Sequence, residues 1–126
     1  LLECKRCCSV WTMPEPPTVI LGLTTEADAI RAEALASELL ARRLVACISL
    51  IPITSMYRWQ GALQRDMEVQ MLMKTTVDRL DQLQAVVMEL HSYDTPEWLS
   101  WPAQASPAYG GWAAEVVSPV DQQQAS

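Results

Sequence analysis

The strongest constraint on the fold of this chain is a pair of long strand-like segments separated by a glycine. An apolar run, Leu44–Ile53, leads into the aromatic and charged segment Tyr57–Gly61 (Tyr-Arg-Trp-Gln-Gly). The next segment, Met67–Lys74, alternates apolar and polar side chains with period two, which is typical of a strand with one buried face. Gly61 favours a tight turn. The sequence therefore predicts a long β-hairpin, interrupted or bulged at Pro52 because proline cannot donate to a strand ladder.

The segments around this hairpin predict an α+β protein. In chain order they are a strand Thr18–Leu23, a helix from a Thr25 cap to about Arg43, a helix from Thr75-Thr76 to His91, a strand Glu97–Trp101 halted by Pro102, and a short helix Ala108–Val117. The order strand, helix, strand, strand, helix, strand is that of the ferredoxin-like split βαβ arrangement. Right-handed crossovers would place both long helices on one face of an antiparallel sheet.

The opposite face of that sheet needs a cover. The predicted strands carry Val, Met, Ile, Leu and Trp, and a large exposed apolar surface is unusual on a soluble monomer. The first helix has two apolar patches, one with Ile30 and one with Leu35 and Leu39, so one patch is available for another part of the protein or another subunit. Either the C-terminal helix covers the open face or identical faces pack together. Self-association is the preferred interpretation.

Composition disfavours several kinds of partner. The chain has 126 residues, of which 50% are hydrophobic and 19% are charged, as in an ordinary single globular domain. The net charge of −6, with only Lys5 and Lys74 as lysines, opposes binding to nucleic-acid phosphates or to an anionic membrane surface. The longest apolar run, Leu44–Ile53, is shorter than the roughly 20 residues of a membrane-spanning helix.

The first twelve residues differ from the rest of the chain. They hold Cys4, Cys7 and Cys8, which suggest a metal or redox site, but a segment outside the functional domain, upstream of a start at Met13, is the preferred interpretation. The segment has no apolar core like that of a secretory signal, so we expect a cytoplasmic protein in which Cys47 is reduced. The expected organisation is an N-terminal extension over residues 1–17, one domain over 18–117 and a disordered tail over 118–126.

Several different short motifs follow one another along the predicted domain, with unbroken spacing from about Val19 to Ala114. They are Leu44–Cys47, Ile51-Pro52, Ser55–Gly61, Glu68-Val69, Lys74–Thr76, Leu90–Glu97, and Tyr109 with Trp112. Together they resemble the CutA family, the divalent-cation-tolerance proteins. The resemblance implies a homotrimer of ferredoxin-like subunits whose long hairpins wrap neighbouring subunits. It also implies a cleft between subunits, lined by aromatic and charged side chains.

The resemblance further implies a role in tolerance of divalent metal ions, copper among them. The trimeric architecture of the family is similar to that of the PII signalling proteins, so a small-ligand sensor or signalling adaptor is the alternative. No catalytic activity is established for the family, and the sequence contains no P-loop, dinucleotide fingerprint or His-Glu-x-x-His motif. We therefore expect a non-enzymatic protein, with an enzyme using Lys74, His91 and Glu97 as a third possibility.

The site residues follow from the same motifs. The candidate cleft residues are Trp59, Lys74, Tyr93, Glu97 and Trp112. We hypothesise that Lys74 and Glu97 form a partly buried ion pair in the cleft, because a buried carboxyl beside tryptophan needs a cation to remain charged. The methionines of the second hairpin strand are expected to pack rather than to bind copper.

His91 is the candidate ligand for a divalent metal ion such as copper. Imidazole suits Cu²⁺ and Zn²⁺, and Glu97 or Tyr93 is close in sequence. The alternative is a helix C-terminal histidine with a structural hydrogen bond. Thr24 and Leu90 stand where some relatives carry cysteine and a second histidine, so tight copper binding is not expected.

Overall fold

Four strands form a single antiparallel sheet against which three helices pack in the computed structural model, which describes residues 17–119. The elements are β1 (Thr18–Glu26), α2 (Ala29–Ala41), β2 (Cys47–Trp59), β3 (Ala62–Thr75), α3 (Val77–Leu90), β4 (Leu99–Gln104) and α4 (Pro107–Val116). The strand order across the sheet is β2-β3-β1-β4. The prediction of an α+β protein with an antiparallel sheet and a short C-terminal helix is confirmed. Most of the predicted extension and tail lies outside the described residues.

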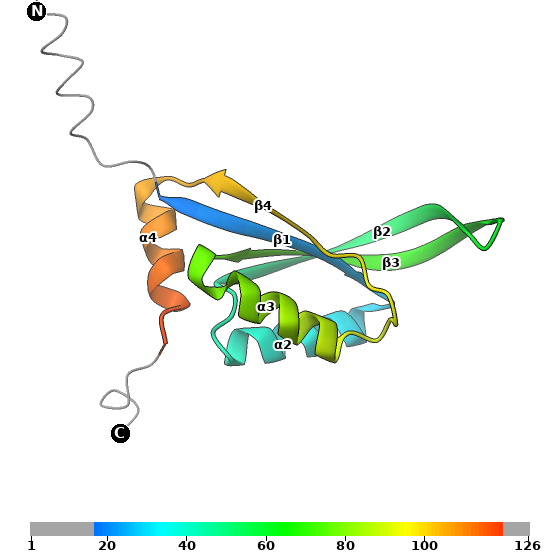
Figure 1. Ribbon diagram of the computed structural model, residues 1–126, viewed down its shortest axis with the longest axis horizontal. Coiled ribbons are helices and arrows are strands. Elements are labelled where there is room, and N and C mark those ends of the chain that lie inside the picture. Colours follow the sequence, from blue (N-terminus) through cyan, green and yellow to red (C-terminus); the bar gives the residue numbers. More distant parts are fainter. Residues whose placement is uncertain (1–16, 120–126) are drawn as a thin grey trace, which may run out of the picture.

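The two longer helices, α2 and α3, lie on the same face of the sheet (Figure 1). Between the helices and the sheet, Val69, Met71 and Met73 of β3 are almost fully buried, as their alternation predicts. The helices contribute Ala32, Leu35, Ala36, Leu39, Leu83, Val86 and Val87 to the same core. Of the two apolar patches predicted on the first helix, the one with Leu35 and Leu39 is buried against the sheet, whereas Ile30 of the other patch is 80% exposed in the described chain.

The predicted hairpin is longer and more regular than expected. β2 and β3 pair without a break from Cys47 opposite Lys74 to Trp59 opposite Ala62. Gln60 and Gly61 both have positive φ, as a two-residue type I′ turn requires. Because β1 pairs only with residues 69–75 of β3, the rest of the hairpin projects beyond the sheet, to the right in Figure 1.

Three local predictions are wrong for identifiable reasons. Pro52 causes no bulge, because β2 is an edge strand and needs ladder hydrogen bonds on one side only. Pro102 does not halt β4, which is the other edge strand and pairs Pro102 with Ile20. Asp28 rather than Thr25 caps α2: its Oδ1 accepts the Arg31 N–H at 2.8 Å, while Thr25 continues β1.

The face of the sheet opposite α2 and α3 is only partly covered. At one end, Ala113 of α4 and the adjoining Val117 pack on Val19 of β1. Elsewhere, Leu99 and Trp101 of β4 remain 53% and 40% exposed. We call this surface the open face; its apolar strand positions are Leu21, Leu23, Ile51, Leu72, Leu99 and Trp101.

No helix within residues 17–119 has the length and apolar character needed to cross a membrane.

Candidate functional site

A groove of about 870 Å³ lies between the projecting part of the hairpin and the segment that follows α3. The hairpin contributes Tyr57, Trp59, Asp66 and Glu68, and the following segment contributes Tyr93, Asp94 and Glu97. We call it the tip groove. Its volume is typical of small-molecule binding sites. Three of the candidate cleft residues, Trp59, Tyr93 and Glu97, therefore meet around one cavity.

Two tyrosine–carboxylate hydrogen bonds order the walls of the tip groove. The Tyr93 hydroxyl donates to Glu68 Oε2 at 2.7 Å, and the Tyr57 hydroxyl donates to an oxygen of Asp66. Burial, followed by the hydrogen bond to Glu68, raises the pKa of Tyr93 far above its ordinary value. The hydrogen bond to Asp66 is the main cause of the raised pKa of Tyr57. Both phenols are therefore protonated donors at neutral pH, and each carboxylate keeps further acceptor positions.

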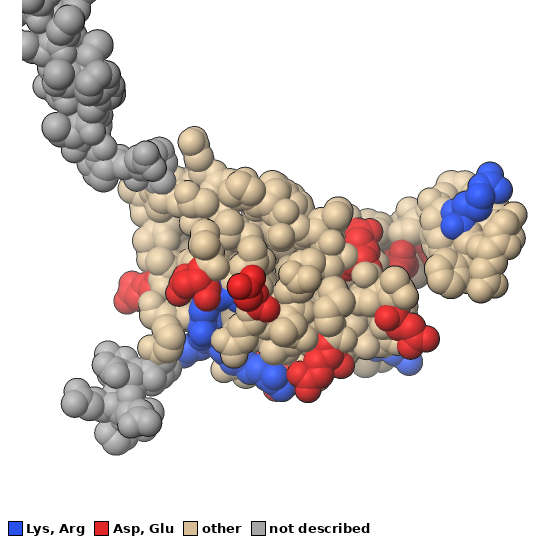
Figure 2. All heavy atoms as spheres, viewed as in Figure 1, with Lys and Arg blue, Asp and Glu red and all other residues tan. Residues whose placement is uncertain are grey.

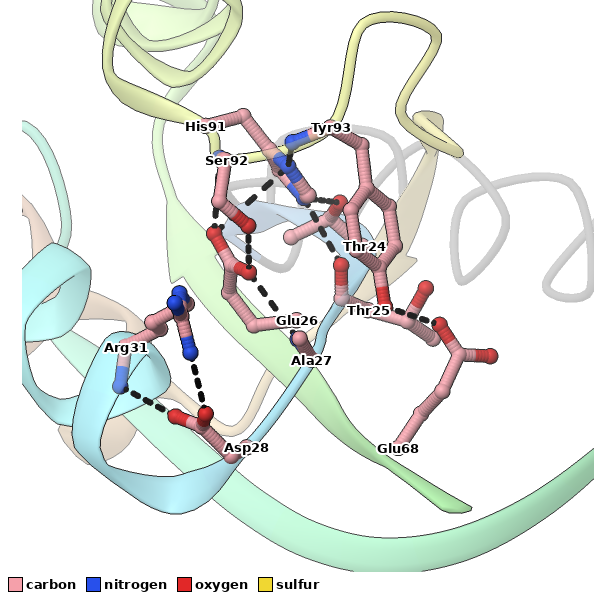
Figure 3. A network of polar contacts seen from close by, with 10 residues as sticks. All are labelled: Thr24, Thr25, Glu26, Ala27, Asp28, Arg31, Glu68, His91, Ser92 and Tyr93. Atoms are coloured by element: carbon pink, nitrogen blue, oxygen red, sulfur yellow. Dashed lines mark hydrogen bonds and ion pairs between the residues drawn. The ribbon is translucent and has the colours of Figure 1, made fainter. Parts of the chain in front are cut away.

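Behind this wall, a buried carboxylate joins the end of β1 to the residues after α3 (Figure 3). Glu26 Oε1 accepts the Ala27 N–H at 2.9 Å and the Ser92 hydroxyl, and Oε2 accepts the Ser92 N–H at 3.1 Å. Burial alone would raise the pKa of Glu26. The hydrogen bonds, that from the Ser92 hydroxyl first, outweigh burial and lower the pKa below 4.5. Glu26 thus anchors the segment that carries Tyr93.

His91 uses both ring nitrogens inside the fold. Nε2 lies 2.7 Å from the Thr25 carbonyl oxygen and 3.1 Å from the Thr24 hydroxyl, so it carries the proton that the carbonyl accepts. Nδ1 accepts the Tyr93 N–H at 3.0 Å and lies 3.5 Å from Glu26 Oε2. The imidazole is completely buried. No nitrogen lone pair of His91 is directed towards solvent.

The contacts of His91 indicate whether a divalent metal ion could bind at this residue. A metal ligand needs a free lone pair, and tight sites bring several ligands together. Within residues 17–119, no group of three or more His, Cys, Asp or Glu side chains is arranged to hold a metal ion. The folded single chain therefore does not fit a copper or zinc site at His91, and no chemical step is assigned to such an ion.

The other two candidate cleft residues lie towards the opposite end of the sheet. Lys74 Nζ donates to Ser49 Oγ at 3.0 Å and lies 3.9 Å from Cys47 Sγ. Trp112 of α4 contacts Tyr109, with ring centroids 5.5 Å apart.

Within the described chain, Lys74 and Glu97 form no ion pair. Glu97 lines the tip groove together with Glu68. Lys74 is six residues from Glu68 along β3, which corresponds to roughly 20 Å of strand. One chain therefore separates the hypothesised partners instead of pairing them.

Sequence reasoning did not single out Glu26, Asp66 or Glu68. A signal existed for Glu26: it lies opposite Val69, on the strand face whose neighbours are apolar, so an acid at this position needs hydrogen-bond donors. Glu68 and Asp66 carry no such signal, because acids on the polar face of a hairpin are usually solvated. Their partners, Tyr93 and Tyr57, become visible only once the fold brings them together.

The antiparallel sheet, the two helices on one face and the projecting hairpin define a small α+β protein with a groove beside its hairpin. Residues 20–116 match the CutA1 divalent ion tolerance protein family. The chain belongs to this family.

Curated relatives and solved structures agree with this assignment. A divalent-cation tolerance protein CutA of Citrobacter koseri is 41% identical over 87 residues, which are 68% of this chain and 76% of the relative. The protein of the same name from Escherichia coli is 43% identical over 86 residues, 68% of this chain and 77% of the relative. The structure of CutA from Synechococcus elongatus superimposes with a TM-score of 0.80 at 40% identity, covering 83% of this chain and 95% of that one. These relatives are named as tolerance proteins, not as enzymes.

Proposed function

We propose that this protein acts without catalysis, as a cytoplasmic homotrimer, in the tolerance of divalent metal ions such as copper. Membership of the CutA family supports the tolerance role, because the relatives carry that name. The strand order β2-β3-β1-β4 supports the ferredoxin-like arrangement that the family resemblance implies.

The observation that most supports the proposed homotrimer is the open face. Leu99 and Trp101 are about half exposed there, and α4 covers only one end of the surface. Such a surface is buried favourably against a copy of itself. Among the described residues, residues 62–68 of β3 pair with β2 but not with β1, so this projecting part of the hairpin is available to contact the next subunit.

Two subunits would also complete the cleft that the sequence predicts. Lys74 and Trp112 lie at one end of the sheet and the hairpin end at the other, so a single chain does not bring them together. In a trimer, the hairpin of one subunit can approach the Lys74 end of the next. The Lys74–Glu97 pair is therefore proposed only between subunits.

The tolerance role is tested by growth of a bacterial strain that lacks its own protein of this family. The chain is expressed at matched levels beside the E. coli relative, and growth is followed in rising copper. Restoration of growth by both proteins supports the proposal. Restoration of growth by the relative alone would contradict the proposed tolerance role of this chain.

The alternative is a small-ligand sensor or signalling adaptor, as among PII-like trimers. The tip groove favours it, because its volume of about 870 Å³ suits a small organic ligand better than a bare ion. Native mass spectrometry of untagged protein distinguishes the two: a metal adduct supports direct metal binding, an organic adduct supports sensing, and a monomer contradicts the proposed assembly.

A further inference from the structure

The projecting part of the hairpin has two faces of opposite charge. Because side chains alternate along a strand, Asp66 and Glu68 share the face that borders the tip groove, and Arg65 lies on the other face. We call this second face the arginine face; its residues are Thr54, Met56, Arg58, Leu63, Arg65 and Met67, none of them acidic. In Figure 2, a basic side chain lies at the far end of the hairpin, while acidic side chains lie nearer the body.

The arginine face is also apolar and exposed. It continues the side of β3 on which Val69 is buried beneath α2 and α3. Beyond the helices, Met56, Leu63 and Met67 are 63%, 64% and 66% exposed. In the strand register, Arg65 lies opposite Met56 and between Leu63 and Met67 on its own strand. An arginine that apolar neighbours can shield from water is typical of the centre of a protein–protein contact.

The contacts of the two arginines on this face differ from those of the other arginines within residues 17–119. The others donate hydrogen bonds inside the chain: Arg31 to Asp28, Arg42 to Glu38, Arg43 to the Val116 carbonyl, and Arg79 to the Arg43 and Val117 carbonyls. In the same part of the chain, the guanidinium groups of Arg58 and Arg65 have neither an acidic partner nor a hydrogen bond. A guanidinium group pairs best with a carboxylate or a phosphate. The arginine face therefore suits an anionic partner.

The rest of the molecule favours carboxylates over phosphates. A net charge of −6 repels a nucleic acid or an anionic membrane, whose charge extends well beyond two arginines. A peptide segment presents only a few charges, and its apolar side chains can pack on the exposed methionines. Methionine side chains are flexible and are common on surfaces that bind peptides.

The contact between subunits proposed above uses the opposite face of the hairpin. The pair of Lys74 and Glu97 would form in the tip groove, which Glu97 lines together with Asp66. The arginine face is turned away from this groove, although Met56 also borders the groove. A neighbouring subunit bound in the groove therefore leaves the two hairpin arginines available to a different partner.

We propose that the arginine face binds a segment of another protein in which acidic and apolar side chains lie side by side. Carboxylates of the segment would accept hydrogen bonds from Arg58 and Arg65, and its apolar side chains would pack on Met56, Leu63 and Met67. This surface goes beyond the proposed tolerance function and does not depend on it, since no metal ion takes part.

Fluorescence anisotropy of a labelled peptide in which glutamate and leucine alternate tests the proposal on the full-length protein. We expect saturable binding that salt weakens. Arg65→Gln should weaken it about tenfold, as the loss of a central interface arginine predicts. The matched control is Arg42→Gln, an exposed arginine of similar accessibility paired with Glu38, which should leave the affinity unchanged. Equal affinity for the native protein and Arg65→Gln would overturn the proposal.

Two further peptides separate the proposed contact from general stickiness. A peptide of alternating lysine and leucine should not bind, and one of alternating glutamate and serine should bind at least about tenfold more weakly than the glutamate–leucine peptide. Binding of the lysine–leucine peptide with equal affinity overturns the proposal, because charge would then play no part.

Native mass spectrometry separates an outside partner from a second copy of this chain. The double variant Arg58→Gln/Arg65→Gln should keep the oligomeric mass of the native protein. A fall to the monomer mass means that a neighbouring subunit covers the arginine face, which overturns the proposal. A native protein that is monomeric but binds the glutamate–leucine peptide through Arg65 supports the arginine face and contradicts only the proposed homotrimer.

Discussion

The indole ring of Trp98 lies over Gly22 of β1, so closely that a Cβ atom at position 22 would be 2.8 Å from the Trp98 ring. Trp98 packs against the core between the sheet and helices α2 and α3, and the preceding residue, Glu97, lines the tip groove. The glycine therefore provides the space that allows the segment after α3 to lie against the sheet.

Gly22→Ala should destabilise the protein by about 1–3 kcal/mol, because the added methyl group forces the indole out of its packed position. Urea unfolding measures the change. The control is Gly111→Ala in α4, where an added Cβ meets nothing within 4 Å. It should be neutral or stabilising by up to about 1 kcal/mol, because alanine favours helix more than glycine does. Equal stability of Gly22→Ala and the native protein would contradict the packing of Trp98.

Tyr93→Phe should destabilise the protein by about 0.5–1.5 kcal/mol, because it removes the hydrogen bond to Glu68. The raised pKa of Tyr93 means that the folded state favours the protonated phenol. Its contribution to stability is complete below the ordinary tyrosine pKa of 10.0 and is lost as pH rises above it. Unfolding of both proteins between pH 8 and about 11 should show the difference between them shrink at the alkaline end. A constant difference would contradict the assigned hydrogen bond.

Glu26→Gln should destabilise the protein by about 1–3 kcal/mol at neutral pH, because it weakens three hydrogen bonds to a buried carboxylate. The pKa of Glu26 is lowered in the fold, so its stabilising contribution is present above 4.5 and is lost as pH falls through the folded value. The stability difference from the native protein should therefore narrow below about pH 4. Glu33→Gln, at an exposed site on α2, is the control and should show no such narrowing.

His91→Gln should lower stability by about 1–3 kcal/mol, because His91 both donates to the Thr25 carbonyl and accepts the Tyr93 N–H. The variant should bind as much copper as the native protein, since the native imidazole has no free lone pair. Paired denaturation and copper titration separate the two effects. If the native protein bound a copper ion that a still folded His91→Gln variant did not bind, His91 would be a copper ligand.

The features that the sequence predicts well are those set by local pattern. The period-two alternation around Met71 identifies the buried face of β3, and Gly61 identifies the turn, because both depend on residues next to each other in the chain. The proline predictions failed because the effect of Pro52 and Pro102 depends on whether their strands lie at an edge of the sheet, which neighbouring residues do not reveal.

The candidate site was predictable only in part, for a related reason. Trp59, Tyr93 and Glu97 were selected from motifs and line one groove, but the grouping depends on where the hairpin and the segment after α3 meet. Lys74 belongs to the same motifs, yet the length of β3 carries it away from Glu97. The partners of Glu26 could not be assigned from the sequence, because two of its three hydrogen-bond donors belong to Ser92, 66 residues further along the chain.

The hairpin turn provides a last prediction, because it has one residue that the turn does not favour. Gln60 has φ of 50°, which is uncommon for a side chain other than Asn, Asp or Gly, whereas Asn-Gly is the preferred pair in a type I′ turn. Gln60→Asn should therefore stabilise the protein by about 0.5–1 kcal/mol, measured by thermal unfolding, without changing its oligomeric mass. Gln64→Asn, on the extended strand after the turn, is the control and should give no gain. If both variants or neither were stabilised, the strain would not lie at Gln60.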